Sequence, residues 1–220
     1  MTSNYFCRKI LSEEHVNYVK ELITAKSVHW RDGSLTVLDE ILPQKKLYET
    51  FNQDVFNIIM KDLEKDMEFR SIVVPSQTTN LIISKITEGG YYRCHLDSEF
   101  NGNYSTTIFL NDPDEYVGGE LQLLIDDNLK NIKLKAGWGV TYATGIPHQV
   151  LDVTEGVRYA GVFWSTSVIS DPFMREMHHR LNKIQEKLES DKVYSNLREF
   201  ADDPVYEIEM LKKKIIRRCR

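Results

Sequence analysis

The middle of the chain consists of short β-rich runs, and this pattern restricts the fold more than any other feature. The runs are rich in Val, Ile, Leu, Thr, Tyr and Phe and are separated by Gly, Asn, Asp and Pro. Runs of this kind, with turn residues about every eight to twelve positions, are typical of an antiparallel sandwich or barrel. The predicted strands lie near residues 81–87, 91–97, 105–110, 120–125, 131–134, 138–143, 147–152 and 157–166.

Helical patterns precede this β-rich region. Ser12 is followed by two acidic residues, as is typical of a helix N-terminus, and apolar residues then fall on one face. A second helix is expected after Pro43, because apolar residues recur at every fourth position and would form one stripe. They are Leu47, Phe51, Val55 and Ile59.

Two Asp-Pro pairs predict helix starts after the β-rich region, at Asp171 and Asp203, because Asp caps a helix and Pro fits its first position. The first of these helices should bury an apolar stripe. Its members are Met177, Leu181, Ile184 and Leu188. Adjacent residues on a helix diverge by about 100°. His178 and His179 therefore cannot chelate one ion as a pair, and we expect both at the surface.

Four residues in the β-rich region suggest a chemistry. Alternate side chains of a strand leave the same face, so His95 and Asp97 can reach one ion. A distant strand carrying His148 would complete the two-His, one-carboxylate set that is typical of non-haem iron(II) oxygenases. Arg158 has a planar guanidinium that can bind a carboxylate bidentately. A His-x-Asp pair is weak evidence by itself, so the surrounding sequence decides the interpretation.

That surrounding sequence contains further motifs in a fixed order. They are Gly89-Gly90-Tyr91-Tyr92, Thr106-Thr107-Ile108-Phe109-Leu110-Asn111, Gly118-Gly119-Glu120-Leu121, Gly137-Trp138-Gly139, Pro147-His148 and Gly156-Val157-Arg158. In order and spacing they resemble the prolyl-4-hydroxylase-like branch of the iron(II)/2-oxoglutarate-dependent oxygenases, and most closely the bacterial PKHD-type hydroxylases. The resemblance is strong over about residues 79 to 170.

The resemblance implies a mostly β fold with flanking helices, built on a double-stranded β-helix (jelly-roll) core, which eight strands would also suit. It implies Fe(II), 2-oxoglutarate as co-substrate, O2 and ascorbate as reductant. His95, Asp97 and His148 would be the iron ligands, and Arg158 would bind the C5 carboxylate of 2-oxoglutarate. We expect a helical support region over 1–70, the catalytic core over 71–170 and a helical extension over 171–220.

Other residues near the co-substrate are less clearly assigned. Tyr92 matches a family tyrosine near the co-substrate, whereas hydroxyls that many relatives carry are missing at Ile86 and Phe109. Either the hydroxyl of Tyr92 or another hydrogen-bond donor replaces these missing hydroxyls, or Arg158 contributes more to binding the co-substrate. By strand alternation Trp164 shares a face with Arg158. It would close the pocket to water, or it is simply part of the core.

The leading hypothesis is hydroxylation of a prolyl residue in a protein or peptide, with release of succinate and CO2. Hydroxylation of a free amino acid or another small metabolite is the alternative. A nucleic-acid demethylase is more remote, because such enzymes carry a second Arg where this chain has Trp164. A non-catalytic jelly-roll module with a structural metal is also remote, because three ligands describe an open site. Substrate should enter near residues 98–104 and 112–117.

Composition limits partners and location. A net charge of -5 argues against nucleic-acid binding by the whole surface. The basic tail from Lys212 to Arg220 could steer the protein toward an acidic or RNA-containing partner, or simply complement a helix dipole. No apolar run is long enough for a membrane span and no secretion signal is recognised, so we expect a cytoplasmic protein. Three scattered cysteines, Cys7, Cys94 and Cys219, are expected to be free thiols.

Overall fold

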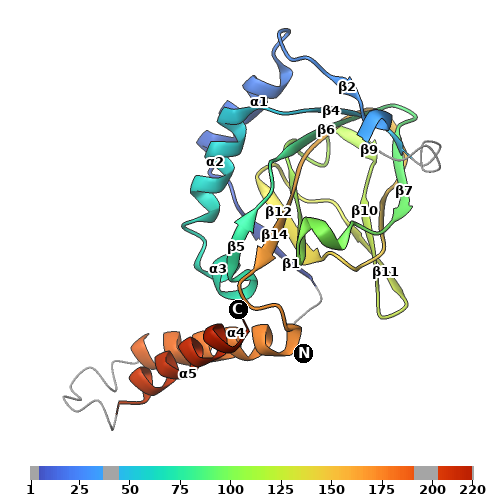
Figure 1. Ribbon diagram of the computed structural model, residues 1–220. Coiled ribbons are helices and arrows are strands. Elements are labelled where there is room, and N and C mark those ends of the chain that lie inside the picture. Colours follow the sequence, from blue (N-terminus) through green and yellow to red (C-terminus); the bar gives the residue numbers. More distant parts are fainter. Residues whose placement is uncertain (1–4, 37–44, 191–202, 220) are drawn as a thin grey trace. The chain divides into compact units, whose positions relative to one another are not determined.

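The computed structural model describes residues 5–36, 45–190 and 203–219 (Figure 1). The chain divides into two compact units. One contains Met1–Lys65 and Thr78–Ser165, and the other contains Asp66–Gln77 and Thr166–Arg220. The three-part division expected from the sequence stays a prediction.

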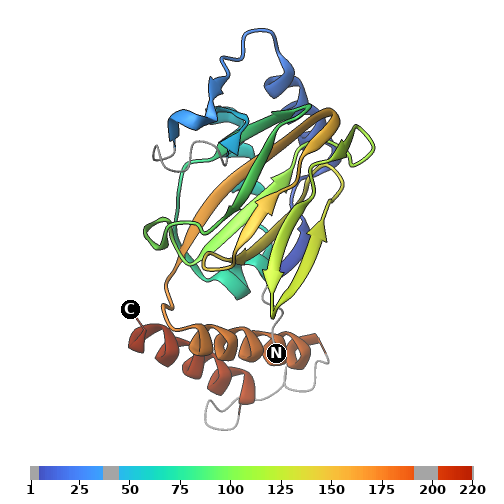
Figure 2. The ribbon, with the colours of Figure 1, turned by 90° about the vertical axis from the view of Figure 1, so that its right-hand side faces the viewer.

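Two antiparallel sheets form most of the first unit (Figures 1 and 2). The larger has the order β1 (Tyr5–Lys9), β12 (Trp138–Ala143), β8 (Tyr104–Phe109), β14 (Val153–Ser167), β6 (Ile82–Thr87), β4 (Tyr48–Thr50) and β2 (Arg31–Asp32), and β9 (Tyr116–Gly118) also pairs with β14. The smaller has the order β11 (Asn128–Ile132), β10 (Leu121–Ile125), β13 (His148–Val150), β7 (Tyr91–His95) and β3 (Lys45–Lys46). Short 3-10 helices lie at η1 (Gly33–Thr36) and η3 (Glu99–Asn101). The expected antiparallel β core is confirmed.

The core of this unit lies between the two sheets. Its buried cluster takes residues from strands of both sheets and from the turns between them. The members are Leu47, Ile86, Phe109, Tyr116, Leu121, Leu123, Ile125, Ile132, Val140, Tyr142, Val150 and Val153. Inward side chains recur at alternate positions, as a pleated strand requires. Burying these side chains fixes the register of the strands, because a slip of one residue would turn every apolar side chain outward.

Two helices accompany the larger sheet (Figure 1). The first, α1 (Glu13–Thr24), begins where expected, because the Ser12 side chain accepts a hydrogen bond from the backbone N–H of His15. The second, α2 (Gln53–Leu63), packs against the outer face of the sheet, where Ile59 approaches Gly161 of β14. Covering this face explains why β8 is buried at outward as well as inward positions.

The predicted extent of the second helix is wrong. Residues 45–50 are extended and form β3 and β4, and the helix begins only after Asn52, whose side chain accepts hydrogen bonds from two backbone N–H groups. Leu47 is buried in the core between the sheets, whereas Phe51 is 48% exposed. Pairing of this segment with β7 and β6 outweighs the four-residue periodicity.

Most predicted strands are confirmed within two residues at either end. The strand expected over 131–134 is instead β11 (Asn128–Ile132), and the last strand, β14, extends from Val153 to Ser167. The sequence analysis missed β1, β9, β5 (Pro75–Thr78) and the short β2, β3 and β4. Strands of two or three residues carry too little alternation to be recognised from sequence.

The second unit contains α3 (Met67–Val73), α4 (Pro172–Ser190) and α5 (Pro204–Arg218). The two predicted starts are confirmed, because Asp171 and Asp203 accept hydrogen bonds from backbone N–H groups in the first turns of α4 and α5. Over the described ranges 5–36, 45–190 and 203–219, none of the helices combines the length and apolarity needed to cross a bilayer.

The buried face of α4 differs from the predicted apolar stripe. Ile184 is half exposed, and the buried residues are Arg175 and His178. The Nη1 group of Arg175 donates to the backbone carbonyls of Ile169 and Ser170, so this buried donor has its acceptors within the unit. Charged and polar partners therefore determine the orientation of this helix.

The expectation that His178 and His179 lie at the surface is also wrong. His178 is only 6% exposed, and His179 is partly buried with its Nδ1 2.8 Å from the Ser71 hydroxyl of α3. Asn182 donates to the same hydroxyl. Burial lowers the pKa of both histidines, and the ammonium of Lys212 lowers that of His178 further. Both imidazoles are thus held neutral in a polar contact between α3 and α4.

We predict that acidification destabilises this helical unit. The folded-state pKa values lie below the ordinary value of 6.5, so the unfolded chain binds more protons and the free energy of unfolding falls as pH drops below that value. The protection factors of the α4 amides, which are corrected for the intrinsic exchange rate at each pH, should fall between about pH 7 and about pH 5. His178→Gln should weaken this dependence, whereas His29→Gln, at an exposed position, should retain it. Identical pH profiles for the His178 variant and the wild type would contradict the assignment.

Candidate active site

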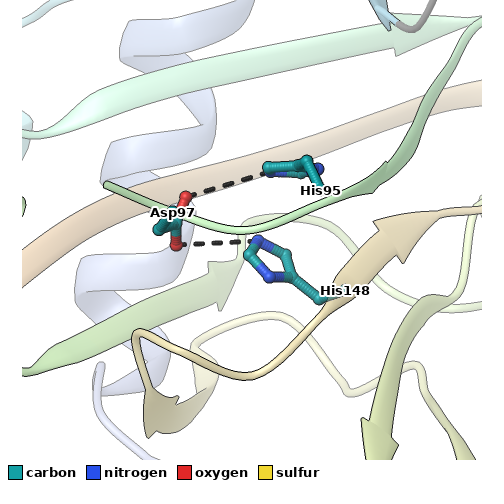
Figure 3. A group of neighbouring side chains, drawn as sticks. All are labelled: His95, Asp97 and His148. Carbon is teal, nitrogen blue, oxygen red and sulfur yellow. Dashed lines mark ion pairs between the residues drawn. The ribbon is translucent and has the colours of Figure 1, made fainter. Parts of the chain in front are cut away.

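Three potential metal ligands meet at adjacent strands of the smaller sheet (Figure 3). His95 ends β7 and His148 begins β13, and these two residues face each other in the register of the paired strands. Asp97 follows β7 and lies 3.9 Å from Nε2 of His95 through Oδ1 and 3.6 Å from Nε2 of His148 through Oδ2. One ligand atom from each side chain lies within 4.8 Å of the others. The cross-strand pairing therefore joins residues that are distant in the sequence.

Hydrogen bonds orient all three side chains. Nδ1 of His95 donates to the carbonyl of Arg93 at 2.8 Å, and Nδ1 of His148 donates to the carbonyl of Ile146 at 2.9 Å. Because a carbonyl only accepts, each Nδ1 carries a proton, and Nε2 is the nitrogen of each ring that is left to face a metal. The Ser105 hydroxyl donates to Oδ2 of Asp97 at 2.6 Å.

The charge state of the cluster suits a divalent cation. Burial lowers the pKa of His95 to about 4, and the neighbouring His148 contributes to this shift. His95 is consequently a neutral imidazole at pH 7, which is the form that binds metals. Two imidazoles and one carboxylate match the donor set of open non-haem iron(II) sites.

A buried cation, Arg158 of β14, lies in the same cavity and is only 1% exposed. Its Nε and Nη2 atoms have no hydrogen-bond partner, and none of the carboxylates in the described ranges forms an ion pair with it. Its guanidinium carbon lies 5.3 Å from the centre of the Phe109 ring. The hydroxyl of Tyr116 is nearby but lacks hydrogen-bond geometry, and burial lowers the pKa of Arg158. A desolvated cation without an opposite charge is costly, so this position fits an anionic ligand.

One cavity of about 360 Å³ connects the triad and Arg158. This volume suits a small organic molecule. Arg158, Val162 and Trp164 line it from alternate positions of β14, as strand alternation predicts. Ile86 is also part of the lining. The two positions that lack a hydroxyl, Ile86 and Phe109, thus contribute apolar surface near the guanidinium.

Tyr92 and Trp164 both lie at the triad end of this cavity. The Tyr92 ring stacks on His95 with centroids 3.7 Å apart, and burial raises the pKa of its hydroxyl to about 12. Trp164 pairs with Ser105 in the register of β14 and β8, and Ser105 is the residue that binds Asp97. The indole N–H of Trp164 is buried without a partner in the described part of the chain.

Sequence reasoning missed an ion pair in the cavity wall. Lys45 and Glu49 are buried, pair with each other and line the cavity, and the Lys45 ammonium lies 5.0 Å from the centre of the Tyr92 ring. They lie in the extended segment that the sequence analysis assigned to a helix. Lys45, Leu47 and Glu49 are buried at alternate positions, as in a strand. In the sequence, however, Lys and Glu at these positions look like the solvent-exposed face of a helix.

The two predicted entrance segments have different outcomes. Ser98 and Asn101 line the cavity, so the segment 98–104 reaches it, and its role in substrate entry stays a prediction. No residue of 112–117 is among those that line it, so the role of this loop in substrate entry stays a prediction. Glu115 instead accepts a hydrogen bond from Lys20 of α1, and Asp112 accepts one from the backbone of Ala136. These contacts hold the loop away from the cavity.

Comparisons with known proteins identify the class that this fold and site define. The sequence profile of the 2OG-Fe(II) oxygenase superfamily matches residues 81–166. The structure resembles a Pseudomonas putida prolyl-4-hydroxylase with a TM-score of 0.56 and 17% identity, covering 75% of this chain and 94% of that one. It also resembles a prolyl hydroxylase of Trichoplax adhaerens, solved with a peptide fragment of hypoxia inducible factor, with a TM-score of 0.60 and 12% identity over 82% of this chain and 87% of that one. The expected double-stranded β-helix core is confirmed.

Within that class, sequence relatives define the family. The chain is 32% identical over 189 residues to a PKHD-type hydroxylase of Maricaulis maris, which covers 82% of this chain and 85% of the relative. It is 28% identical over 204 residues to a PKHD-type hydroxylase of Cupriavidus metallidurans, covering 83% and 88%. The chain belongs to the PKHD-type hydroxylase family and is a 2-oxoglutarate-dependent dioxygenase. Fe(II), 2-oxoglutarate and O2 are the implied cofactor and co-substrates, and ascorbate is typical of the family.

Proposed function

We propose that this enzyme hydroxylates an unactivated C–H bond of a prolyl residue in a protein or peptide, with release of succinate and CO2. The observation that carries the proposal is the cavity that holds the two-His, one-carboxylate cluster together with a buried arginine that forms no ion pair with the described residues. The prolyl hydroxylases among the structural neighbours support the choice of a prolyl substrate, and one of those neighbours was solved with a peptide.

His95, Asp97 and His148 would hold Fe(II) through their Nε2 atoms and a carboxylate oxygen. Bound iron, with 2-oxoglutarate and O2, supplies the oxidising power that hydroxylates an unactivated carbon. Arg158 would bind the far carboxylate of 2-oxoglutarate, because its Nε and Nη2 donors are buried and have no acceptor among the described residues. This ligand would neutralise the guanidinium.

The remaining residues of the chain would orient and protect the reactants. The carbonyls of Arg93 and Ile146 fix the two imidazoles, and Ser105 fixes the carboxylate, so that the ligand atoms keep their directions. Trp164 and Val162 present apolar surface that excludes water from the cavity. Leu96 lines the same cavity and is 60% exposed, so it is available to contact a peptide side chain at the entrance.

The proposal predicts hydroxylation of proline-containing peptides. Purified protein with Fe(II), ascorbate and 2-oxoglutarate should add the mass of one oxygen atom to a Pro residue, located by fragmentation mass spectrometry. The Asp97→Ala protein is the control and should leave the peptide unchanged. Oxygen transfer to a free amino acid alone would replace the peptide assignment with the small-metabolite alternative, and demethylation of a methylated oligonucleotide would replace it with nucleic-acid repair.

A further inference from the structure

The Arg158 end of the cavity has largely apolar walls, but two hydroxyl groups face it. They belong to Thr107 of β8 and Tyr142 of β12, and both side chains are almost fully buried while lining the cavity. In the paired strands Tyr142 lies opposite Ser105, and Thr107 is on the same face as Ser105, two positions along β8. This register brings the Thr107 side chain within hydrogen-bonding reach of the Tyr142 hydroxyl.

Tyr142 spans the distance between the triad and the buried arginine. The edge of its ring contacts His148, with centroids 5.1 Å apart. Its hydroxyl lies within electrostatic reach of both Arg158 and Asp97. Tyr142 is therefore in contact with one proposed metal ligand, while its hydroxyl lies near the guanidinium.

The hydroxyls of Thr107 and Tyr142 lack a hydrogen-bond acceptor, among the described residues, for one of their two protons. Thr107 and Tyr142 have one proton each, and a hydrogen bond between them uses one of the two. The other proton needs an acceptor, and Arg158 can only donate. A phenol hydroxyl can donate as well as accept a hydrogen bond, so Tyr142 can supply this proton. An acceptor-rich, anionic group between Arg158 and these hydroxyls would satisfy all three side chains.

We propose that Tyr142, supported by Thr107, binds the far carboxylate of 2-oxoglutarate together with Arg158. Tyr142 would thereby replace the hydroxyls that are missing at Ile86 and Phe109, which the sequence left unassigned. The inference rests on the proposed function of this site, because it assumes that 2-oxoglutarate occupies the cavity. It makes Tyr142 a co-substrate-binding residue and Thr107 a positioning residue.

Calorimetric titration tests this inference without turnover. Mn(II) replaces iron, and the dissociation constant of 2-oxoglutarate is measured for each variant. Tyr142→Phe removes one donor to a charged acceptor and should raise this constant about tenfold. Thr107→Val should raise it by a smaller factor. Tyr159→Phe is the matched control, since Tyr159 is adjacent to Arg158 on β14 but packs against Trp30, and its constant should equal that of the wild type.

A second ligand separates binding from a general disturbance of the fold. Pyruvate has the 2-oxo acid group but lacks the far carboxylate, so Tyr142→Phe should leave its dissociation constant unchanged. Equal weakening of pyruvate and 2-oxoglutarate would overturn the inference in favour of a structural role. Wild-type affinity for 2-oxoglutarate in Tyr142→Phe, with binding still lost in Arg158→Met, would overturn it while the proposed function stands. Absence of 2-oxoglutarate binding in the wild type would overturn both.

Discussion

Replacing Asp97 with Ala is expected to lower both the affinity for Fe(II) and the rate of succinate formation more than about 100-fold. Changes to groups that merely orient a metal ligand cost about 10- to 100-fold, so loss of a ligand should cost more. The variant would also leave two imidazoles without the carboxylate that balances the charge of the ion. Anaerobic Fe(II) titration and a succinate assay measure the two effects.

Cys94 provides the matched control for this experiment. It lies on β7 next to His95, but it is exposed and, by strand alternation, points away from the cluster. Cys94→Ser should therefore bind Fe(II) and form succinate as the wild type does. An Asp97→Ala protein that still bound Fe(II) with wild-type affinity would remove the basis for the proposed metal site.

Replacing Arg158 with Met is expected to raise the KM for 2-oxoglutarate at least about 100-fold, because two charge-assisted hydrogen bonds to a carboxylate are lost. The ligand-free variant should nevertheless be at least as stable as the wild type. Met removes a buried charge that has no counter-ion within the described part of the chain, and such a charge opposes folding until an anion binds. Thermal unfolding with and without 2-oxoglutarate should show that the variant has lost the stabilisation conferred by the ligand.

Lys85→Met is the control for the change of charge. Lys85 lies on β6 beside Tyr159 of β14, and its ammonium is 5.4 Å from the centre of the Trp30 ring rather than in the cavity. This variant should keep the wild-type KM. Clear destabilisation of ligand-free Arg158→Met, combined with an unchanged KM, would mean that the guanidinium serves the fold and not the co-substrate.

The sequence predicted the cluster better than it predicted the cavity wall. Strand alternation predicted that His95 and Asp97 lie near one another, although β7 ends at His95 and Asp97 follows it, and the family motifs pointed to His148. The pairing of His148 opposite His95, which makes the cluster possible, depends on the register of two strands that are far apart in the chain. Register of this kind is decided by burial of the whole sheet and not by local sequence.

The wall was harder to predict because its polar residues are buried. Lys45 and Glu49 resemble a solvated pair, and the apolar spacing from Leu47 onward imitates a helix. The cap at Asn52 and the pairing of β3 and β4 with their neighbours decide the outcome. Likewise Tyr142 appears as an ordinary strand residue until β12 and β8 are paired.

Crystals grown anaerobically and soaked with Fe(II) and 2-oxoglutarate test the central claim most directly. Anomalous scattering at the iron absorption edge should give one strong peak bonded to His95, Asp97 and His148, with the far carboxylate of 2-oxoglutarate on Arg158. Iron at another position, or a cavity without 2-oxoglutarate beside Arg158, would contradict the proposed site.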